Sequence, residues 1–134
     1  MKEELEHLKF IKICNIDARV FLKIHKANKE HISISNADEW LACYHGEKII
    51  GVVGILTFKN LTRIKSFYVV KEFRNKGVGT KLLDKTLKSY LKYTAFATKY
   101  SFNLFIKNGF IPQCKIKNEI TFLVRDVQNE KSSL

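Results

Sequence analysis

Residues 69–83 read VVKEFRNKGVGTKLL, in which an apolar run enters a basic segment with two glycines and an amphipathic helix pattern follows. That order places backbone N–H groups at a helix N-terminus, where no intrahelical carbonyl accepts their hydrogen bonds. Gly77 and Gly79 lack the Cβ that would keep a phosphate away from the backbone. The helix dipole and the nearby cations Arg74, Lys76 and Lys81 favour negative charge there. The stretch therefore predicts a pyrophosphate-binding turn.

Other phosphate-binding loops fit the spacing less well. A Walker loop needs Gly, four residues and then Gly-Lys-Ser/Thr, and the sequence has no such run. The dinucleotide fingerprint needs a third glycine where Leu82 stands. An ordinary strand-to-helix turn would explain the glycines but not the converging positive charge.

The pattern Arg-x-x-Gly-x-Gly, at Arg74, Gly77 and Gly79, resembles the acyl-coenzyme-A-binding loop of the GCN5-related N-acetyltransferase (GNAT) family. A second stretch, residues 105–110, reads FIKNGF and resembles a later motif of that family, an aromatic followed four residues on by Gly-Phe. Each motif alone is common. Both motifs in the right order, with a helix pattern between them, make the resemblance specific.

The resemblance implies one α/β domain over residues 1–134, with a core at about 8–125 and a polar tail at 126–134. In this single-domain acyl-CoA N-acyltransferase fold, helices flank a mixed β-sheet that is splayed between its fourth and fifth strands. The amides of pantetheine would pair with exposed backbone in that opening, like an added strand.

Residue patterns predict an element order that agrees with this fold. We expect strand 8–14, helix 18–26, a helical turn or loop at 33–39, strands 40–44, 49–56 and 61–70, a helix from 78 to about 91, strand 95–97, helix 101–108, and strands 111–117 and 119–124. Asp17 is expected to cap the first helix, with Val20, Phe21 and Ile24 on its buried face. The 78–91 helix is expected to bury a stripe that includes Leu87, Tyr90 and Leu91.

By resemblance, the cofactor is acetyl-CoA, held by the backbone of the fourth strand and the turn after it. The implied binding residues are Phe67, Tyr68, Val69, Val70, Arg74, Asn75, Lys76, Gly77, Val78, Gly79, Thr80, Thr98 and Phe105. A backbone N–H of Val69 or Val70 would polarise the thioester carbonyl.

Two positions depart from the family pattern. Phe105 stands where the family often has a tyrosine that protonates the leaving thiolate, and Thr98 stands where an asparagine often follows the fifth strand. The candidates for proton transfer are therefore His31, in a loop that would flank the acceptor channel, and the phenols of Tyr68 and Tyr100. No strand carboxylate offers itself as a general base, since residues 57–71 contain neither Asp nor Glu.

The leading hypothesis is an acetyl-CoA-dependent N-acetyltransferase in which an amine attacks directly in a ternary complex. The alternative is a nucleic-acid-directed protein on the same scaffold, either a DNA- or RNA-modifying enzyme or a CoA-binding module with degenerate catalysis. Its motivation is the net charge of +11 and the spacing of Lys81, Lys85, Lys88 and Lys92, which also suits a solvated helix face.

The remaining features predict a cytoplasmic protein that is a monomer or a homodimer. The start of the chain does not resemble a signal peptide, and no apolar run approaches the ~20 residues of a membrane span. Cys14, Cys43 and Cys114 each fall among apolar residues, so we expect buried, reduced thiols. No Cys/His cluster suggests a metal.

Overall fold

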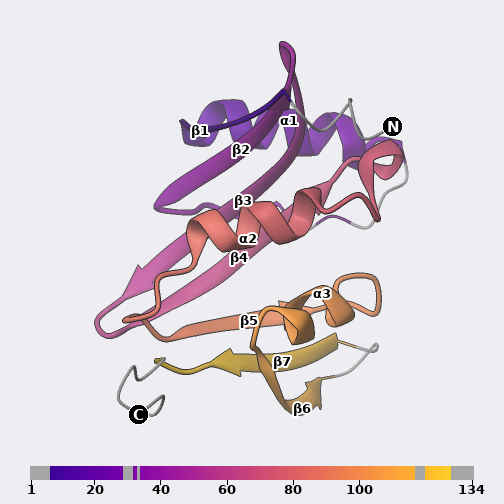
Figure 1. Ribbon diagram of the computed structural model, residues 1–134. Helices are drawn as coiled ribbons and strands as arrows, with labels where there is room; N and C mark the ends of the chain where they lie inside the picture. Colours follow the sequence, from indigo (N-terminus) through magenta and orange to yellow (C-terminus); the bar gives the residue numbers. More distant parts are fainter. Residues whose placement is uncertain (1–6, 29–31, 33, 117–119, 128–134) are drawn as a thin grey trace.

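The computed structural model describes residues 7–28, 32, 34–116 and 120–127. Figure 1 shows one mixed sheet with helices on both faces. In chain order the elements are β1 (Leu8–Ile13), α1 (Asn15–Lys26), β2 (Glu39–His45), β3 (Lys48–Phe58), β4 (Leu61–Val69), a 3-10 turn η2 (Lys71–Phe73), α2 (Val78–Thr86), β5 (Tyr93–Ala97), α3 (Phe102–Lys107), β6 (Ile111–Ile116) and β7 (Ile120–Arg125).

The seven strands form a sheet in the order β1-β2-β3-β4-β5-β7-β6, and only β4 and β5 pair in parallel among the described strands. α2 and α3 cover one face and belong to a single apolar cluster that includes Val78, Leu82 and Phe105. α1 packs on the other face, where Ala18 and Leu22 meet Trp40. The expected α/β fold with a flanked mixed sheet is confirmed.

The sheet opens between β4 and β5, as the resemblance implied. Parallel pairing starts at Thr62 with Tyr93 and ends at Ile64 with Ala95. Just beyond that point the β3–β4 register shifts between Gly54 and Ile55. Such a shift leaves one extra residue on β4 and bends the strand. Residues 65–69 therefore do not pair with β5.

The buried face of α1 differs from the expected one. Ala18, Phe21 and Leu22 are buried, whereas Val20 and Ile24 are exposed. Asp17 lies in the first turn, and Cys14 occupies the N-cap position. The apolar residues of α1 fall on both sides of the helix, so hydrophobic periodicity alone did not identify the side that meets the sheet.

α2 is shorter than expected and ends at Thr86. The hydroxyl of Tyr93, on β5, donates to the Thr86 carbonyl at 3.2 Å and accepts from the Lys88 amide at 2.9 Å. Burial raises the pKa of the Tyr93 phenol, which keeps it protonated as a donor. A tertiary contact thus satisfies the helix end. Lys88 and Lys92 consequently lie beyond the helix, so the predicted four-lysine stripe is wrong.

Residues 34–38 are not helical, so the described part of the 33–39 segment takes the loop form of the two that the sequence left open. The expectation of buried cysteines needs correction. Of the three cysteines, Cys43 is buried but Cys14 and Cys114 are exposed. Cys14 occupies the N-cap position of α1, and Cys114 lies on β6 at the edge of the sheet.

Candidate functional site

A cleft of about 870 Å³ lies where β4 and β5 diverge. Its first wall consists of the end of β4, the turn after it and the start of α2. Its second wall consists of the loop after β5 and α3. The lining residues are Phe67, Tyr68, Val69, Lys71, Arg74, Asn75, Gly77, Gly79, Thr80, Thr98, Tyr100, Ser101, Asn103, Leu104 and Lys107.

The turn before α2 has the backbone form of an anion-binding site. Asn75 has φ 62° and Gly77 has φ 87°, so left-handed residues alternate with others along the turn. Gly77 is the N-cap of α2, and no side chain caps the helix. The amides of Val78, Gly79 and Thr80 are therefore N-terminal donors without an intrahelical acceptor, beside the cleft.

The two glycines have different roles. A Cβ on Gly77 would meet no atom within 4 Å, so this glycine is needed for its positive φ and leaves the cleft open. A Cβ on Gly79 would lie 2.8 Å from Leu104 Cδ2 and 3.0 Å from Phe67 Cζ. Gly79 thus lets α2 approach α3 and β4, a packing role that the sequence did not indicate.

The backbone of β4 distinguishes Val69 from Val70. The Val70 amide donates to the Ile50 carbonyl of β3 at 2.8 Å, so it is not free to polarise a thioester. Successive peptide groups of a strand point to opposite edges, which directs the Val69 and Phe67 amides toward the gap. The Val69 carbonyl accepts from Arg74 Nε at 2.8 Å. Arg74 is thereby held at the mouth of the cleft.

The two candidate phenols lie in different surroundings. Tyr68 is buried, with the His25 ring 5.3 Å from its own and the Arg74 guanidinium 5.3 Å from its centroid. Tyr100 is 66% exposed on the second wall, and Lys99 Nζ lies 5.4 Å from its ring. Both line the cleft. His31 lies outside the described residues.

Four of the predicted binding residues do not line the cleft. They are Val70, Lys76, Val78 and Phe105. Lys76 places its ammonium 5.6 Å from the Phe73 ring. Phe105 is buried, with ring centroids 5.9 Å from Phe67 and 5.0 Å from Phe110. The aromatic of the second motif is therefore a core residue here.

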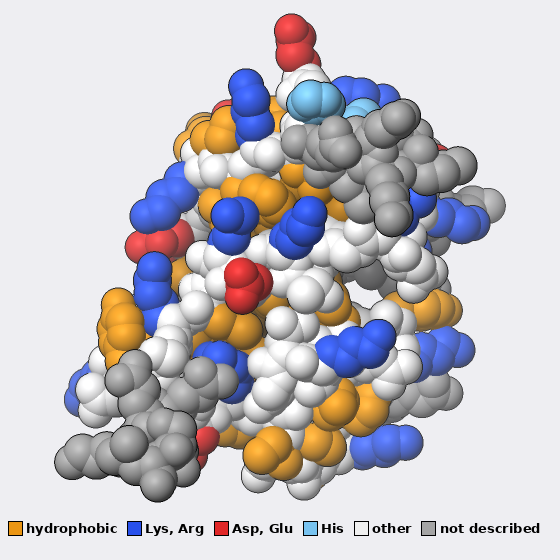
Figure 2. Space-filling view, in the orientation of Figure 1, with side chains coloured by type: hydrophobic (Ala, Val, Ile, Leu, Met, Phe, Trp, Pro, Cys, Tyr) orange, Lys and Arg blue, Asp and Glu red, His pale blue; other side chains and the backbone are white. Residues whose placement is uncertain are grey.

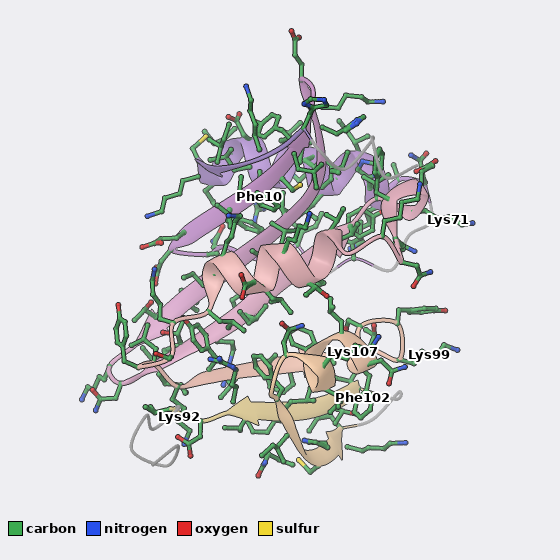
Figure 3. All side chains as sticks on the ribbon, viewed as in Figure 1. Phe10, Lys71, Lys92, Lys99, Phe102 and Lys107 are labelled. Atoms are coloured by element: carbon green, nitrogen blue, oxygen red, sulfur yellow. The ribbon has the colours of Figure 1, made fainter. Side chains whose placement is uncertain are left out.

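Sequence reasoning missed five lining residues, Lys71, Ser101, Asn103, Leu104 and Lys107. Lys71 lies on one side of the gap, with Lys107 and Lys99 on the other (Figure 3). Asn103 and Lys107 are four residues apart on α3 and so share a face. Their spacing showed that the two residues share a face of α3. In so short a helix it did not show whether that face lines the cleft or packs on the sheet.

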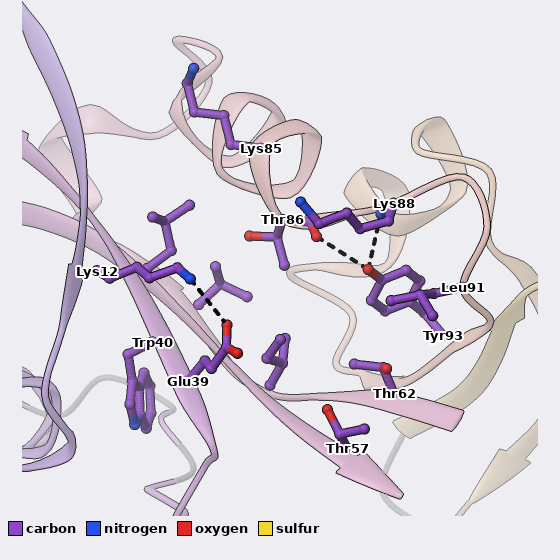
Figure 4. A pocket seen from close by; sticks show the side chains of 13 residues that line it. Lys12, Glu39, Trp40, Thr57, Thr62, Lys85, Thr86, Lys88, Leu91 and Tyr93 are labelled. Carbon is purple, nitrogen blue, oxygen red and sulfur yellow. Dashed lines mark hydrogen bonds and ion pairs between the residues drawn. The ribbon is translucent and has the colours of Figure 1, made fainter. Parts of the chain in front are cut away.

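A smaller hollow of about 200 Å³ lies at the other end of α2 (Figure 4). Lys12 and Glu39 form an ion pair across it, with Nζ and Oε1 3.7 Å apart. Among the described residues, no group of three His, Cys, Asp or Glu side chains could hold a metal ion. The larger cleft is therefore the candidate site. No helix of the described residues has the length and hydropathy to cross a membrane.

A family model described as an acetyltransferase (GNAT) domain matches residues 5–122. The chain belongs to the GNAT acetyltransferase family. A search of curated proteins finds no match.

Solved structures show the same fold. A GNAT-family acetyltransferase from Staphylococcus aureus Mu50 superposes with a TM-score of 0.69 at 17% identity, covering 90% of this chain and 99% of the other. An acyl-CoA N-acyltransferase from Pseudomonas aeruginosa gives 0.70 at 12% identity, covering 89% and 99%. The PaiA N-acetyltransferase from Thermoplasma acidophilum, in complex with coenzyme A, gives 0.65 at 12% identity, covering 90% and 99%.

Proposed function

We propose that this chain transfers an acetyl group from acetyl-CoA to an amine acceptor by direct attack in a ternary complex. The single observation that carries the proposal is the coincidence of two features in one cleft. The N-terminal amides of α2 without an intrahelical acceptor lie at one end, and the edge of β4 that does not pair with β5 runs along its side. A cofactor with a diphosphate at one end and an amide-bearing arm at the other suits both.

The residues present fit coenzyme A. The turn at 75–80 offers backbone N–H groups to the pyrophosphate, and the Arg74 guanidinium adds a charge-assisted donor. Lys71 and Lys107, on opposite walls, are placed to meet further phosphate charge. The amides of Phe67 and Val69 are left for the pantetheine arm and the thioester carbonyl. Acetyl-CoA, when bound, supplies the activated acetyl group.

The chain must also provide a proton to the leaving sulfur. Phe105 has no proton to give and is buried away from the cleft. Tyr100 is an exposed phenol on the second wall, with a lysine ammonium near its ring. We assign Tyr100 as the general acid and Tyr68 as the alternative donor. The acceptor amine must arrive neutral or lose its proton to water, since the described cleft lining contains no carboxylate.

Gly77 and Gly46 offer a matched test of cofactor binding. Both have positive φ, 87° and 65°, and a Cβ on either would meet no atom within 4 Å. Alanine at either position should lower the free energy of unfolding by a similar ~1–2 kcal/mol, because an L side chain is strained at positive φ. Only Gly77→Ala changes the turn at the cleft, so it should weaken acetyl-CoA binding at least 10-fold in calorimetric titration, with Gly46→Ala close to the unmodified protein.

Equal affinity in the two variants would contradict the assigned phosphate site, and no binding by the unmodified protein would end the proposal. Transfer itself is measured as CoA release with spermidine or a lysine-containing peptide as acceptor. Release that does not depend on an amine would contradict N-acetyl transfer.

A second candidate is transfer to an amine carried by a nucleic acid, or binding of a nucleic acid without transfer. Lys and Arg side chains outnumber acidic ones on the face with α2 and α3 in front (Figure 2), and the chain carries +11. Binding of a tRNA or DNA duplex should then fall steeply between 50 and 200 mM salt. Indifference to both polymers would count against this candidate.

A further inference from the structure

The half of the sheet formed by β5, β7 and β6 is covered on one face only. α3 packs on the face that carries Ala95 and Leu123. On the opposite face Phe96 meets Phe122, with ring centroids 5.1 Å apart, and no helix in the described part of the chain lies over them (Figure 1). Strand pairing places the neighbouring apolar residues on the same side. This bare face consists of Phe58, Phe96, Ile111, Ile116, Phe122 and Val124.

A second unpartnered apolar surface runs along α1. Ile16, Val20 and Ile24 are spaced four residues apart and form a ridge on the side of the helix away from the sheet, opposite Ala18 and Leu22. α2 and α3 share the core on the other side of the sheet. The α1 ridge and the bare face therefore lie on the same side of the molecule, next to one another.

We infer that two copies of this chain associate about a two-fold axis, with the α1 ridge of each copy on the bare face of the other. The helix stands about 10 Å above the sheet, so the uncovered half beside it lies about one helix diameter below the top of α1. A two-fold axis places both ridges on both bare faces at once, because each surface meets its counterpart twice. The dimer would complete the missing helix layer.

The exposed apolar area suits a dimer. Seven side chains of the two surfaces, Ile16, Val20, Ile24, Phe58, Phe96, Ile111 and Ile116, are between 42% and 72% exposed. At roughly 150–200 Å² for a large apolar side chain, they leave about 600 Å² per copy open to water. A standard interface buries about 800 Å² per partner, and the largest patch on a typical monomer is about 300–600 Å².

Other occupants match these surfaces less well. The chain's own tail is one such occupant. Residues 128–134 read QNEKSSL and so offer one apolar side chain to an apolar surface. A polyanion needs converging cations with free charge, but Arg63, a cation on this face, lies against its aromatic rings. Its guanidinium lies 5.4 Å from the Phe58 centroid and 5.2 Å from that of Phe96, and its Nε donates to Thr94 Oγ1 at 3.0 Å. An apolar surface of the same chain is the best complement.

Sedimentation velocity on the full chain at about 50 μM tests the inference. The unmodified protein should sediment as a dimer, and Val20→Glu on the ridge and Phe96→Glu on the bare face should each weaken association at least 10-fold. Tyr90→Glu is the matched control, because Tyr90 is exposed outside both surfaces. Circular dichroism confirms that each variant is folded. A monomeric unmodified protein, or dimeric variants, would overturn the inference.

Mixing the two variants tests the arrangement itself. The Val20→Glu copy keeps an intact bare face and the Phe96→Glu copy keeps an intact ridge. One undamaged contact can therefore form only in the mixed dimer. An equimolar mixture should associate more strongly than either variant alone. A mixture no stronger than its components would exclude this arrangement of ridge on bare face.

Discussion

The two walls of the cleft are built by different means. The first wall presents mainly backbone to the cleft, through the N-terminal amides of α2, the edge of β4 that does not pair with β5, and the positive φ angles of Asn75 and Gly77. The second wall presents side chains, which include Tyr100, Asn103 and Lys107. Backbone donors serve any diphosphate and tolerate many sequences, whereas side chains can change with the chemistry required. The difference predicts that mutations in the turn of the first wall alter cofactor affinity, and that mutations of Tyr100 and of the packed residues of α3 alter turnover or packing.

The largest effect is expected at the core of the second wall. Phe105→Ala removes a buried ring that contacts Phe67 and Phe110, and should lower the free energy of unfolding by about 3–5 kcal/mol. Phe105→Tyr tests its chemistry, because it restores the phenol of the family pattern in a buried position. Urea denaturation should show destabilisation, and CoA release should show no gain in rate. A faster enzyme would mean that residue 105 reaches the thiolate.

This contrast also explains how far the sequence could lead. The first wall follows from residues close together in the chain, since Arg74, Gly77 and the apolar run before them specify strand, turn and helix start. The second wall depends on how α3 is rotated over β5 and β7, which six helical residues do not determine. The end of α2 was missed for a similar reason, because the phenol that stops it comes from Tyr93 on another element.

Removing the proposed acid should affect turnover alone. Tyr100→Phe keeps the ring and removes the proton donor, so kcat should fall about 100-fold with little change in acetyl-CoA affinity or in stability. Tyr90→Phe is the matched control, since Tyr90 is exposed and does not line the cleft. Steady-state CoA release measures both. A loss of turnover in Tyr68→Phe instead of Tyr100→Phe would transfer the role to the phenol of the first wall.

A smaller loss is expected where the two walls touch. A Cβ on Gly79 would lie 2.8 Å from Leu104 Cδ2, so Gly79→Ala forces α2 away from α3. The substitution should lower the free energy of unfolding by about 1–3 kcal/mol. Leu104→Ala removes that methyl group, and the double variant should be more stable than the sum of the single losses predicts. Chemical denaturation of the unmodified protein, the two single variants and the double variant gives the coupling free energy between residues 79 and 104. Strict additivity would show that the walls are not held together by this contact.

The smallest effect concerns the thiols, which the fold separates by exposure. Burial raises the pKa of Cys43 to about 11, outweighing the opposite influence of Lys81, so at pH 7.5 the thiol is protonated and unreactive. Cys14 and Cys114 are exposed and should react first with a disulfide reagent. We therefore expect two rapid equivalents in the native protein and a third only on unfolding. Cys43→Ser should leave the rapid phase unchanged, whereas Cys114→Ser should halve it; three rapid equivalents would mean that α2 opens readily from the sheet.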